Sequence, residues 1–259
     1  MNKRVGSGST VGKALVILDL VADFEKPVRF KEIFKISPYP KATLYRFLQT
    51  LTNQNMLQYD PELGTYSLGG RLVRLAHIAS LSASLAPLAK KHTEALATET
   101  GETVHLAQID NGHVLFVDKL KANPRVETLA RVGMVAPAYC TGVGKAMLAF
   151  MAPRQLELAL QKQSFFGYTP NTKRSARSVK QELKVIRKCG VAYDREEHEE
   201  GIISIATPIL VPTGRLLGAI SIATSTARRS LTGLDEFRPS LLETSRRIGE
   251  EAKFLQLQP

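Results

Sequence analysis

Apolar residues that recur every three or four positions predict three helices near the start of the chain. The first follows an N-cap at Ser9 or Thr10 and ends near Phe24. The second is short and stops at Ser37-Pro38, because proline disfavours helical backbone in the residue before it. The third begins at Pro40, where a proline suits the first turn of a helix, and extends to about Asn55.

A predicted β-hairpin follows the third helix. Two short β-prone runs flank Asp60-Pro-Glu-Leu-Gly64, a sequence typical of a turn. Three helices and a hairpin together predict a winged helix-turn-helix domain, mainly α, over residues 10–69. Residues 1–9, which are polar and rich in glycine and serine, are expected to be a disordered arm.

The third helix has an apolar side and a polar side. A helix of this kind, third in a small helical unit, is what helix-turn-helix proteins insert into the major groove of DNA. From Lys26 to Gln49 the chain has six basic residues and one acid, which favours contact with phosphates. We therefore expect double-stranded DNA as a partner. The predicted DNA contacts are Lys41, Thr43, Tyr45, Arg46 and Gln49.

Residues 70–99 have an almost wholly helical pattern with a break near Pro87. We expect a linker helix over 70–84 and the first helix of a second domain after it. The apolar face of this segment is broad, and such a face usually packs on both sides. A dimer contact is therefore predicted here.

From Gly101 onwards the pattern changes to alternating strands and helices, and it predicts an α+β domain over residues 85–259. Two strand-like runs flank Asn111-Gly112, a strong hairpin signal. Adjacent hairpins with helices outside them indicate an antiparallel sheet. Further strands are expected over 126–131, 202–211 and 216–224, and further helices over 142–151, 153–163, 178–189 and 234–254.

The composition narrows the class of protein. The 259 residues carry a formal net charge of +11, which favours a polyanionic partner. Only two cysteines occur, without disulfide-like or metal-like spacing, and neither a signal peptide nor a long apolar run is present. We expect a cytoplasmic protein that has no metal, no cofactor and no membrane contact.

One glycine-rich segment, Thr141-Gly-Val-Gly-Lys-Ala146, resembles a nucleotide-binding loop without matching it. A P-loop requires glycine where Tyr139 stands and Ser or Thr where Ala146 stands. What remains is a helix N-terminus after glycines, whose free N–H groups suit a small carboxylate. Asp194 follows the strand-like run 191–193 and is the acid expected to face a pocket.

The residues do not assemble into a catalytic site. Cys140 is expected to be a buried thiol, and His105 and His113 are expected to pack on facing hairpin strands. Ser204 and Ser221 lie in apolar strands, where each hydroxyl needs a partner in the protein or a ligand. An enzyme with an N-terminal helical dimerisation module remains the alternative to a DNA-binding regulator.

Four segments in this order and spacing resemble the IclR family of bacterial transcriptional regulators, across residues 11–254. They are the stretch from Tyr39 to Leu48, the predicted hairpin from Tyr59 to Gly69, Thr141 to Leu148, and Gly190 to Ser204. The resemblance implies a GAF-like effector domain after the linker helix. It also implies a homodimer or dimer of dimers on a pseudo-palindromic operator, acting as repressor or activator.

The family resemblance also implies an effector pocket for a small organic acid, either a 2-oxo acid or an aromatic acid. Carried over to this sequence, the effector-binding residues are Gly142, Val143, Asp194, Ile202, Ser204, Ser221 and Ala223. Three positions depart from the family pattern. Ser204 is often cysteine in the family, Ala223 stands where some members have a second serine, and Pro38-Tyr39 replaces the more usual Gly-Leu.

Overall fold

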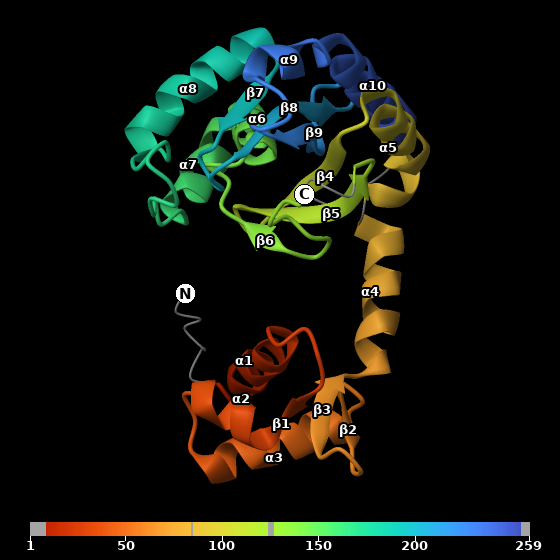
Figure 1. The fold of residues 1–259 in the computed structure, drawn as a ribbon, viewed down its shortest axis with the longest axis vertical. Helices are drawn as coiled ribbons and strands as arrows, with labels where there is room; N and C mark the ends of the chain where they lie inside the picture. The colour runs from red at the N-terminus through yellow and green to blue at the C-terminus, as the bar shows by residue number, and fades with distance from the viewer. Residues whose placement is uncertain (1–8, 84, 124–126, 255–259) are drawn as a thin grey trace. The chain divides into compact units, whose positions relative to one another are not determined.

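The chain folds into two compact units, residues 1–82 and 83–259. The computed structural model describes residues 9–83, 85–123 and 127–254, and the two units are considered separately below (Figure 1). The disordered arm expected over residues 1–9 lies outside the described residues apart from Ser9. Ser9 itself caps the first helix, because its hydroxyl accepts a hydrogen bond from the backbone N–H of Gly12 at 3.1 Å.

The N-terminal unit has the three helices and the hairpin that the apolar pattern predicts. Its core is formed by side chains from all three helices, including Ile17, Ile33 and Leu44, which are fully buried. Pro40 is the N-cap of the third helix rather than its first residue, and that helix ends two residues earlier than expected. The elements are α1 (Thr10–Ala22), β1 (Val28–Arg29), α2 (Phe30–Ile36), α3 (Lys41–Asn53), β2 (Leu57–Asp60) and β3 (Thr65–Leu68).

The hairpin pairs with an extra strand, β1, to give a three-stranded antiparallel sheet in the order β1-β3-β2. Asp60 shapes the turn, because its Oδ1 accepts hydrogen bonds from the N–H groups of Glu62 at 2.9 Å and Leu63 at 3.1 Å. The winged helix-turn-helix prediction is thus confirmed at the level of the fold.

Helix α4 (Gly70–Ala83) follows the hairpin and crosses the boundary between the two units. Its apolar side chains Val73, Leu75 and Ile78 are 73%, 45% and 58% exposed. Leu75 and Ile78 lie about 60° apart around the helix, at 100° per residue, so they expose apolar surface on one side of it.

The C-terminal unit is built on a six-stranded antiparallel sheet in the order β6-β5-β4-β9-β8-β7. Its strands are β4 (Thr103–Asp110), β5 (His113–Lys121), β6 (Val135–Ala136), β7 (Ala192–Arg195), β8 (Ile202–Leu210) and β9 (Leu216–Ser225). Its helices are α5 (Ala86–Thr100), α6 (Gly142–Phe150), α7 (Pro153–Gln161), α8 (Ala176–Cys189), α9 (Leu231–Asp235) and α10 (Arg238–Glu251), with a final 3-10 turn, Ala252–Phe254.

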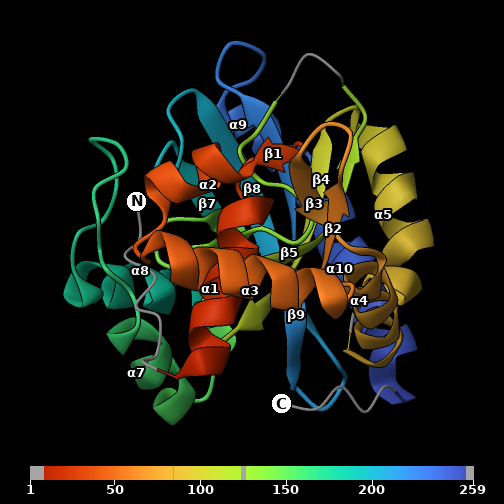
Figure 2. The same cartoon turned by 90° about the horizontal axis from the view of Figure 1, so that it is seen from below.

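Helices cover both faces of this sheet. Helices α6, α7 and α8 lie on one face, and α5, α9 and α10 lie on the other (Figures 1 and 2). Small side chains such as Ala107, Ala206 and Ala219 point toward the first group, whereas Ile205, Ile220 and other large residues point toward the second. The small residues allow α6, of which all but the last residue is buried, to pack closely on the sheet.

Two element predictions are wrong. Residues 127–131 form no strand, because side chains take the backbone groups that a ladder would use: Lys119 Nζ donates to the carbonyl oxygens of Thr128 and Ala130, and Leu129 N–H donates to Glu199. Val126 lies outside the described residues. The single closing helix expected over 234–254 is divided, because Pro239 cannot continue a helix and instead occupies the first turn of α10.

Candidate functional site

The exposed side of α3 carries the residues expected to contact DNA. Leu44, Phe47, Leu48 and Leu51 are buried in the core of the N-terminal unit, which fixes the rotation of the helix. Lys41, Tyr45, Arg46 and Gln49 are exposed and Thr43 is half-buried. The structure therefore brings these five residues to the solvent side of one helix.

Two of these side chains are ordered by a contact along the helix. The Gln49 amide donates to the Tyr45 hydroxyl at 3.2 Å, a pair that the four-residue spacing makes neighbours on the helix surface. Arg46 lies with its guanidinium carbon 5.7 Å from the centroid of the Phe47 ring. Its planar fork of donors suits bidentate contact with a guanine edge.

The surface next to α3 is strongly basic. Lys26, Arg29, Lys31 and Lys35 are all exposed. The single acid of the segment, Glu32, accepts a hydrogen bond from the backbone N–H of Arg29 at 3.0 Å, so it caps α2. Such a cationic surface supplies the phosphate contacts that dominate affinity for DNA.

A small cavity lies between the N-terminal end of α6 and the sheet of the C-terminal unit. Its volume is about 50 Å³. All seven residues expected at the effector pocket line it: Gly142, Val143, Asp194, Ile202, Ser204, Ser221 and Ala223. The sequence missed seven further lining residues: His105, Phe116, Thr128, Ala130, Thr141, His198 and Glu199.

The glycine-rich segment forms one end of the cavity. Thr141 is the N-cap of α6 in extended conformation, and Gly142 begins the helix. A Cβ atom on Gly142 would lie 2.5 Å from Oγ of Ser204, closer than side-chain atoms approach each other. Only glycine lets the helix start so near β8, and the first N–H groups of a helix have no partner within it. This end of the cavity therefore suits an anion.

Asp194 lies in β7 and is almost fully buried. Burial raises its pKa to about 7, although a hydrogen bond from the backbone N–H of Glu197, at 2.8 Å, favours the charged form. The carboxyl group is therefore divided between its protonated and charged forms near neutral pH. The protonated form can donate a hydrogen bond, whereas the charged form can only accept hydrogen bonds.

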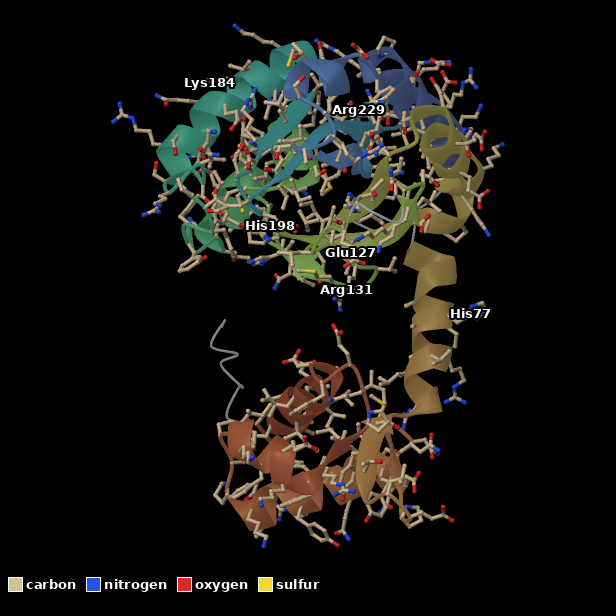
Figure 3. All side chains as sticks on the ribbon, viewed as in Figure 1. His77, Glu127, Arg131, Lys184, His198 and Arg229 are labelled. Atoms are coloured by element: carbon tan, nitrogen blue, oxygen red, sulfur yellow. The ribbon has the colours of Figure 1, made fainter. Side chains whose placement is uncertain are left out.

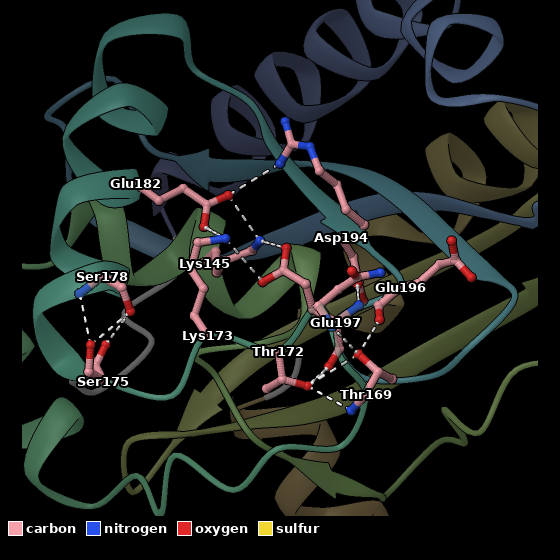
Figure 4. A network of polar contacts seen from close by, with 12 residues as sticks. Lys145, Thr169, Thr172, Lys173, Ser175, Ser178, Glu182, Asp194, Glu196 and Glu197 are labelled. Carbon is pink, nitrogen blue, oxygen red and sulfur yellow. Dashed lines mark hydrogen bonds and ion pairs between the residues drawn. The ribbon is translucent and has the colours of Figure 1, made fainter.

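A buried ion network holds the loop that follows Asp194 (Figure 4). Lys145 of α6 is fully buried, and its Nζ binds Glu197 and lies 3.0 Å from Oε1 of Glu182 on α8. Lys173 adds a second cation 3.0 Å from Oε2 of Glu182. Lys145 is thus occupied by carboxylates, which is a structural reason why the segment does not act as a P-loop.

His105 lines the cavity rather than simply packing in the hairpin. It is buried, its Nε2 lies 3.1 Å from Oγ1 of Thr128, and it pairs across the sheet with Ser221. Burial, assisted by the nearby charge of Lys119, lowers its pKa to about 3. The imidazole is therefore neutral near pH 7 and acts as a hydrogen-bonding group without charge.

Residues 127–130, here called the strap, contribute Thr128 and Ala130 to the lining of the cavity. Lys119 Nζ donates to the carbonyl oxygens of Thr128 at 3.1 Å and Ala130 at 2.5 Å. From the other side, Glu199 accepts a hydrogen bond from the N–H of Leu129 at 2.9 Å. These bonds tie the strap both to β5 and to the loop before β8.

Within residues 9–83, 85–123 and 127–254, no three His, Cys, Asp or Glu side chains gather as a metal site. In the same described ranges, no helix has the length and apolarity needed to cross a membrane. Cys140 is buried beside Gly142, and burial raises the pKa of its thiol.

Comparisons with known proteins identify both units. Residues 10–61 match the IclR helix-turn-helix domain, and residues 78–250 match the C-terminal domain of bacterial transcriptional regulators of the IclR type. The HTH-type transcriptional regulator XynR of Escherichia coli is 30% identical to this chain over 247 residues. The aligned region covers 94% of this chain and 98% of XynR. The transcriptional repressor IclR of Escherichia coli is 25% identical to this chain, and the aligned region covers 94% of this chain and 89% of the repressor.

Solved structures give the same result for the fold. The Thermotoga maritima IclR superposes with a TM-score of 0.76 at 27% identity, covering 95% of this chain and 99% of that one. A homologue from Microbacterium hydrocarbonoxydans, solved with 4-hydroxybenzoate, has a TM-score of 0.77 at 22% identity, with coverage of 93% and 99%. At that identity the second likeness shows the fold alone. The chain belongs to the IclR family of transcriptional regulators, not enzymes, with a DNA-binding helix-turn-helix domain and a C-terminal effector-binding domain.

Proposed function

We propose that this regulator binds a pseudo-palindromic operator through α3 and that a small organic acid in the cavity beside α6 changes its operator affinity. The observation that carries the proposal is the convergence of three kinds of group on one cavity. These are the N–H groups at the start of α6, the Asp194 carboxyl, and the hydroxyls of Ser204 and Ser221. A ligand shifts operator affinity only if it binds two conformations of the protein unequally.

The groups around the cavity suit a 2-oxo acid. Its carboxylate would accept hydrogen bonds from the α6 N-terminus, where the helix dipole favours negative charge. Its oxo group, or the hydroxyls of its hydrate, would bond Ser204, Ser221 and Asp194. Because His105 is neutral, recognition of the carboxylate would depend on backbone N–H groups rather than on a buried cation.

The size of the cavity distinguishes the two proposed effector classes. About 50 Å³ is room for roughly four water molecules, which matches an acid of a few heavy atoms. An aromatic acid is larger than this volume, so we expect it to displace the strap and break the bonds of the strap to Lys119 and Glu199. The Microbacterium homologue was solved with an aromatic acid, 4-hydroxybenzoate, so that class belongs in the test.

A dimer is part of the proposal, because a pseudo-palindrome requires two copies of α3. The exposed apolar residues Val73, Leu75 and Ile78 on α4 support a contact between copies along this helix. Burying these side chains between two copies would remove apolar surface from water and hold the two recognition helices at a fixed spacing.

Selection of genomic DNA fragments by the purified full chain tests the proposal. The selection is sequenced and then repeated with pooled 2-oxo acids and, separately, with pooled aromatic acids. We expect a pseudo-palindrome to be enriched and one pool to weaken or shift that enrichment. Enrichment that neither pool alters would contradict the proposed effector class, and the absence of any enriched sequence would contradict the role of α3.

A further inference from the structure

A second, larger cavity lies at the opposite end of α6. It is an open groove of about 610 Å³ between the β4–β5 turn, α7 and the β8–β9 turn, and its apolar lining includes Phe150, Met151, Leu216 and the fully buried Met147. None of its lining residues lines the effector cavity. Its volume lies within the roughly 300–1,000 Å³ typical of small-molecule sites.

One wall of the groove is firmly held. Gln163, next to α7, donates from Nε2 to the carbonyl oxygens of Gly112 at 2.8 Å and Ala159 at 3.1 Å. Gly112 has φ of +84°, and a Cβ atom there would lie 3.1 Å from Cα of Ala159. The hairpin turn is therefore packed directly on α7, so this side of the groove exists before any ligand binds.

The charged residues of the groove are all of one sign. Lys162, Arg187 and Arg215 line it, and none of its lining residues is an acid. Lys162 donates to the Asn111 side chain, and Arg187 donates to the carbonyl oxygen of Met151 at 3.2 Å, so both bind neutral acceptors. Their positive charge is therefore not cancelled by these contacts.

The neighbouring helix adds to this positive charge. Residues 173–188, which include most of α8, contain seven basic residues and one acid. The acid, Glu182, is bound by Lys145 and Lys173, whereas Arg177, Lys184 and Lys188 are exposed, with Lys184 pointing outward from α8 in Figure 3. Arg187 belongs to this helix, so the groove lies beside a surface of positive potential.

From these features we infer that the groove binds a small amphipathic monocarboxylate, distinct from the effector. The apolar tail lies on Phe150, Met151 and Leu216, and the carboxylate lies at the basic side chains Lys162 and Arg187. Burial of the tail supplies affinity, and the absence of acids selects an anion over a neutral or cationic molecule of the same shape. Because α6 lines both cavities, the two sites are joined by one helix.

The five methionines allow a local test in the full chain, because Met147 and Met151 line the groove and Met56 lies in the N-terminal unit. The protein is labelled with ¹³C at the methionine methyl groups and titrated with sodium octanoate. We expect a saturable shift of the Met147 and Met151 signals, with Met56 unchanged. Uncharged 1-octanol is expected to bind roughly two- to fivefold more weakly, the effect typical of partly exposed charges.

A matched pair of variants assigns the binding to the groove. Leu158→Glu adds an acid at a half-exposed position of its wall, and Val185→Glu adds the same charge at an exposed position of α8 outside it. We expect Leu158→Glu to weaken octanoate binding roughly fivefold and Val185→Glu to bind as the wild type does. The inference would be overturned if Leu158→Glu bound octanoate as tightly as the wild type, or if the wild type bound octanol as tightly as octanoate. It would also be overturned if neither the Met147 nor the Met151 signal shifted saturably. If the methionine signals shifted with the protein concentration and not with the octanoate concentration, the groove would bind a second copy of the chain. That result would also overturn the inference.

Discussion

Gly142 and Ser204 are in contact across the proposed effector cavity, since a Cβ atom on Gly142 would lie 2.5 Å from Oγ of Ser204. The first residue of α6 and the third residue of β8 therefore define how far the helix stands from the sheet. That separation decides whether the N–H groups of the helix and the hydroxyls of the strands reach the same ligand.

Replacing Gly142 with alanine is expected to destabilise the C-terminal unit by about 1–3 kcal/mol, because the added methyl group overpacks a closed site. Chemical denaturation measures the loss. In the double variant Gly142→Ala/Ser204→Ala the clashing hydroxyl is gone, so part of the stability should return. Gly233→Ala is the control, since its nearest neighbour would be 3.7 Å away. A double variant no more stable than Gly142→Ala would mean that this contact does not set the position of α6.

The raised pKa of Asp194 predicts how stability depends on pH. Its pKa is about 7 in the folded protein against 3.8 for the free side chain, so the folded state holds a proton that the unfolded state has lost. Stability from this group is therefore full below pH 4 and declines as the pH rises to about 7. The upper bound is about 4 kcal/mol, because one pKa unit corresponds to about 1.4 kcal/mol.

The Asp194→Asn variant tests this prediction. Asparagine keeps the shape but does not titrate, so its free energy of unfolding should fall less between pH 5 and pH 8 than that of the wild type. Urea denaturation at both pH values gives the comparison. Equal slopes for the two proteins would show that Asp194 has an ordinary pKa in the folded state. If Asp194 also binds the effector, calorimetry should detect weaker effector binding by the same variant.

Local sequence patterns predicted most of the elements, because they are set by interactions a few residues apart. The helix periodicity around Leu44 and the Asn111-Gly112 turn are examples, and both elements formed where expected. The strand expected over residues 126–131 failed because Lys119 and Glu199 bind the backbone of the strap. Nothing near residue 128 in the sequence indicates that a carboxylate 70 positions later will take the N–H of Leu129.

The residues of the cavity show the same difference between those that the sequence predicted and those whose partners are distant in the sequence. Its seven predicted residues came from a family resemblance, and the fold gathers all of them. His105 was missed because its role depends on pairing with Ser221, in a strand more than a hundred residues later. Lys145 was recognised only as part of an imperfect P-loop, since its partners Glu182 and Glu197 are 37 and 52 positions away.

The exposed guanidinium of Arg46 is expected to read a base. Arg46→Ala should lose about 1–3 kcal/mol of operator binding free energy and relax the preference at one base position in each half-site. Lys35→Ala, an exposed cation of the adjacent basic surface, is the comparison, since loss of a phosphate contact weakens all sequences alike. Binding isotherms on operator variants separate the two effects. Unchanged discrimination by Arg46→Ala would remove it from base recognition.

The buried cation of Lys145 balances two carboxylates, and its removal should be costly. Lys145→Met keeps most of the apolar part of the side chain but leaves Glu182 and Glu197 facing each other without the charge between them. Breaking a buried ion pair on one side typically costs about 3–5 kcal/mol, and Lys173, 3.0 Å from Glu182, should reduce that loss. Adding Glu197→Gln to Lys145→Met removes one uncompensated charge and should recover part of the stability.

A double-mutant cycle by urea denaturation measures the coupling between Lys145 and Glu197. Lys180→Met is the control, because the partner of Lys180, Glu157, is exposed. Additive effects of the two substitutions would mean that Lys145 stabilises the unit by packing alone, and the loop after Asp194 would then need another anchor.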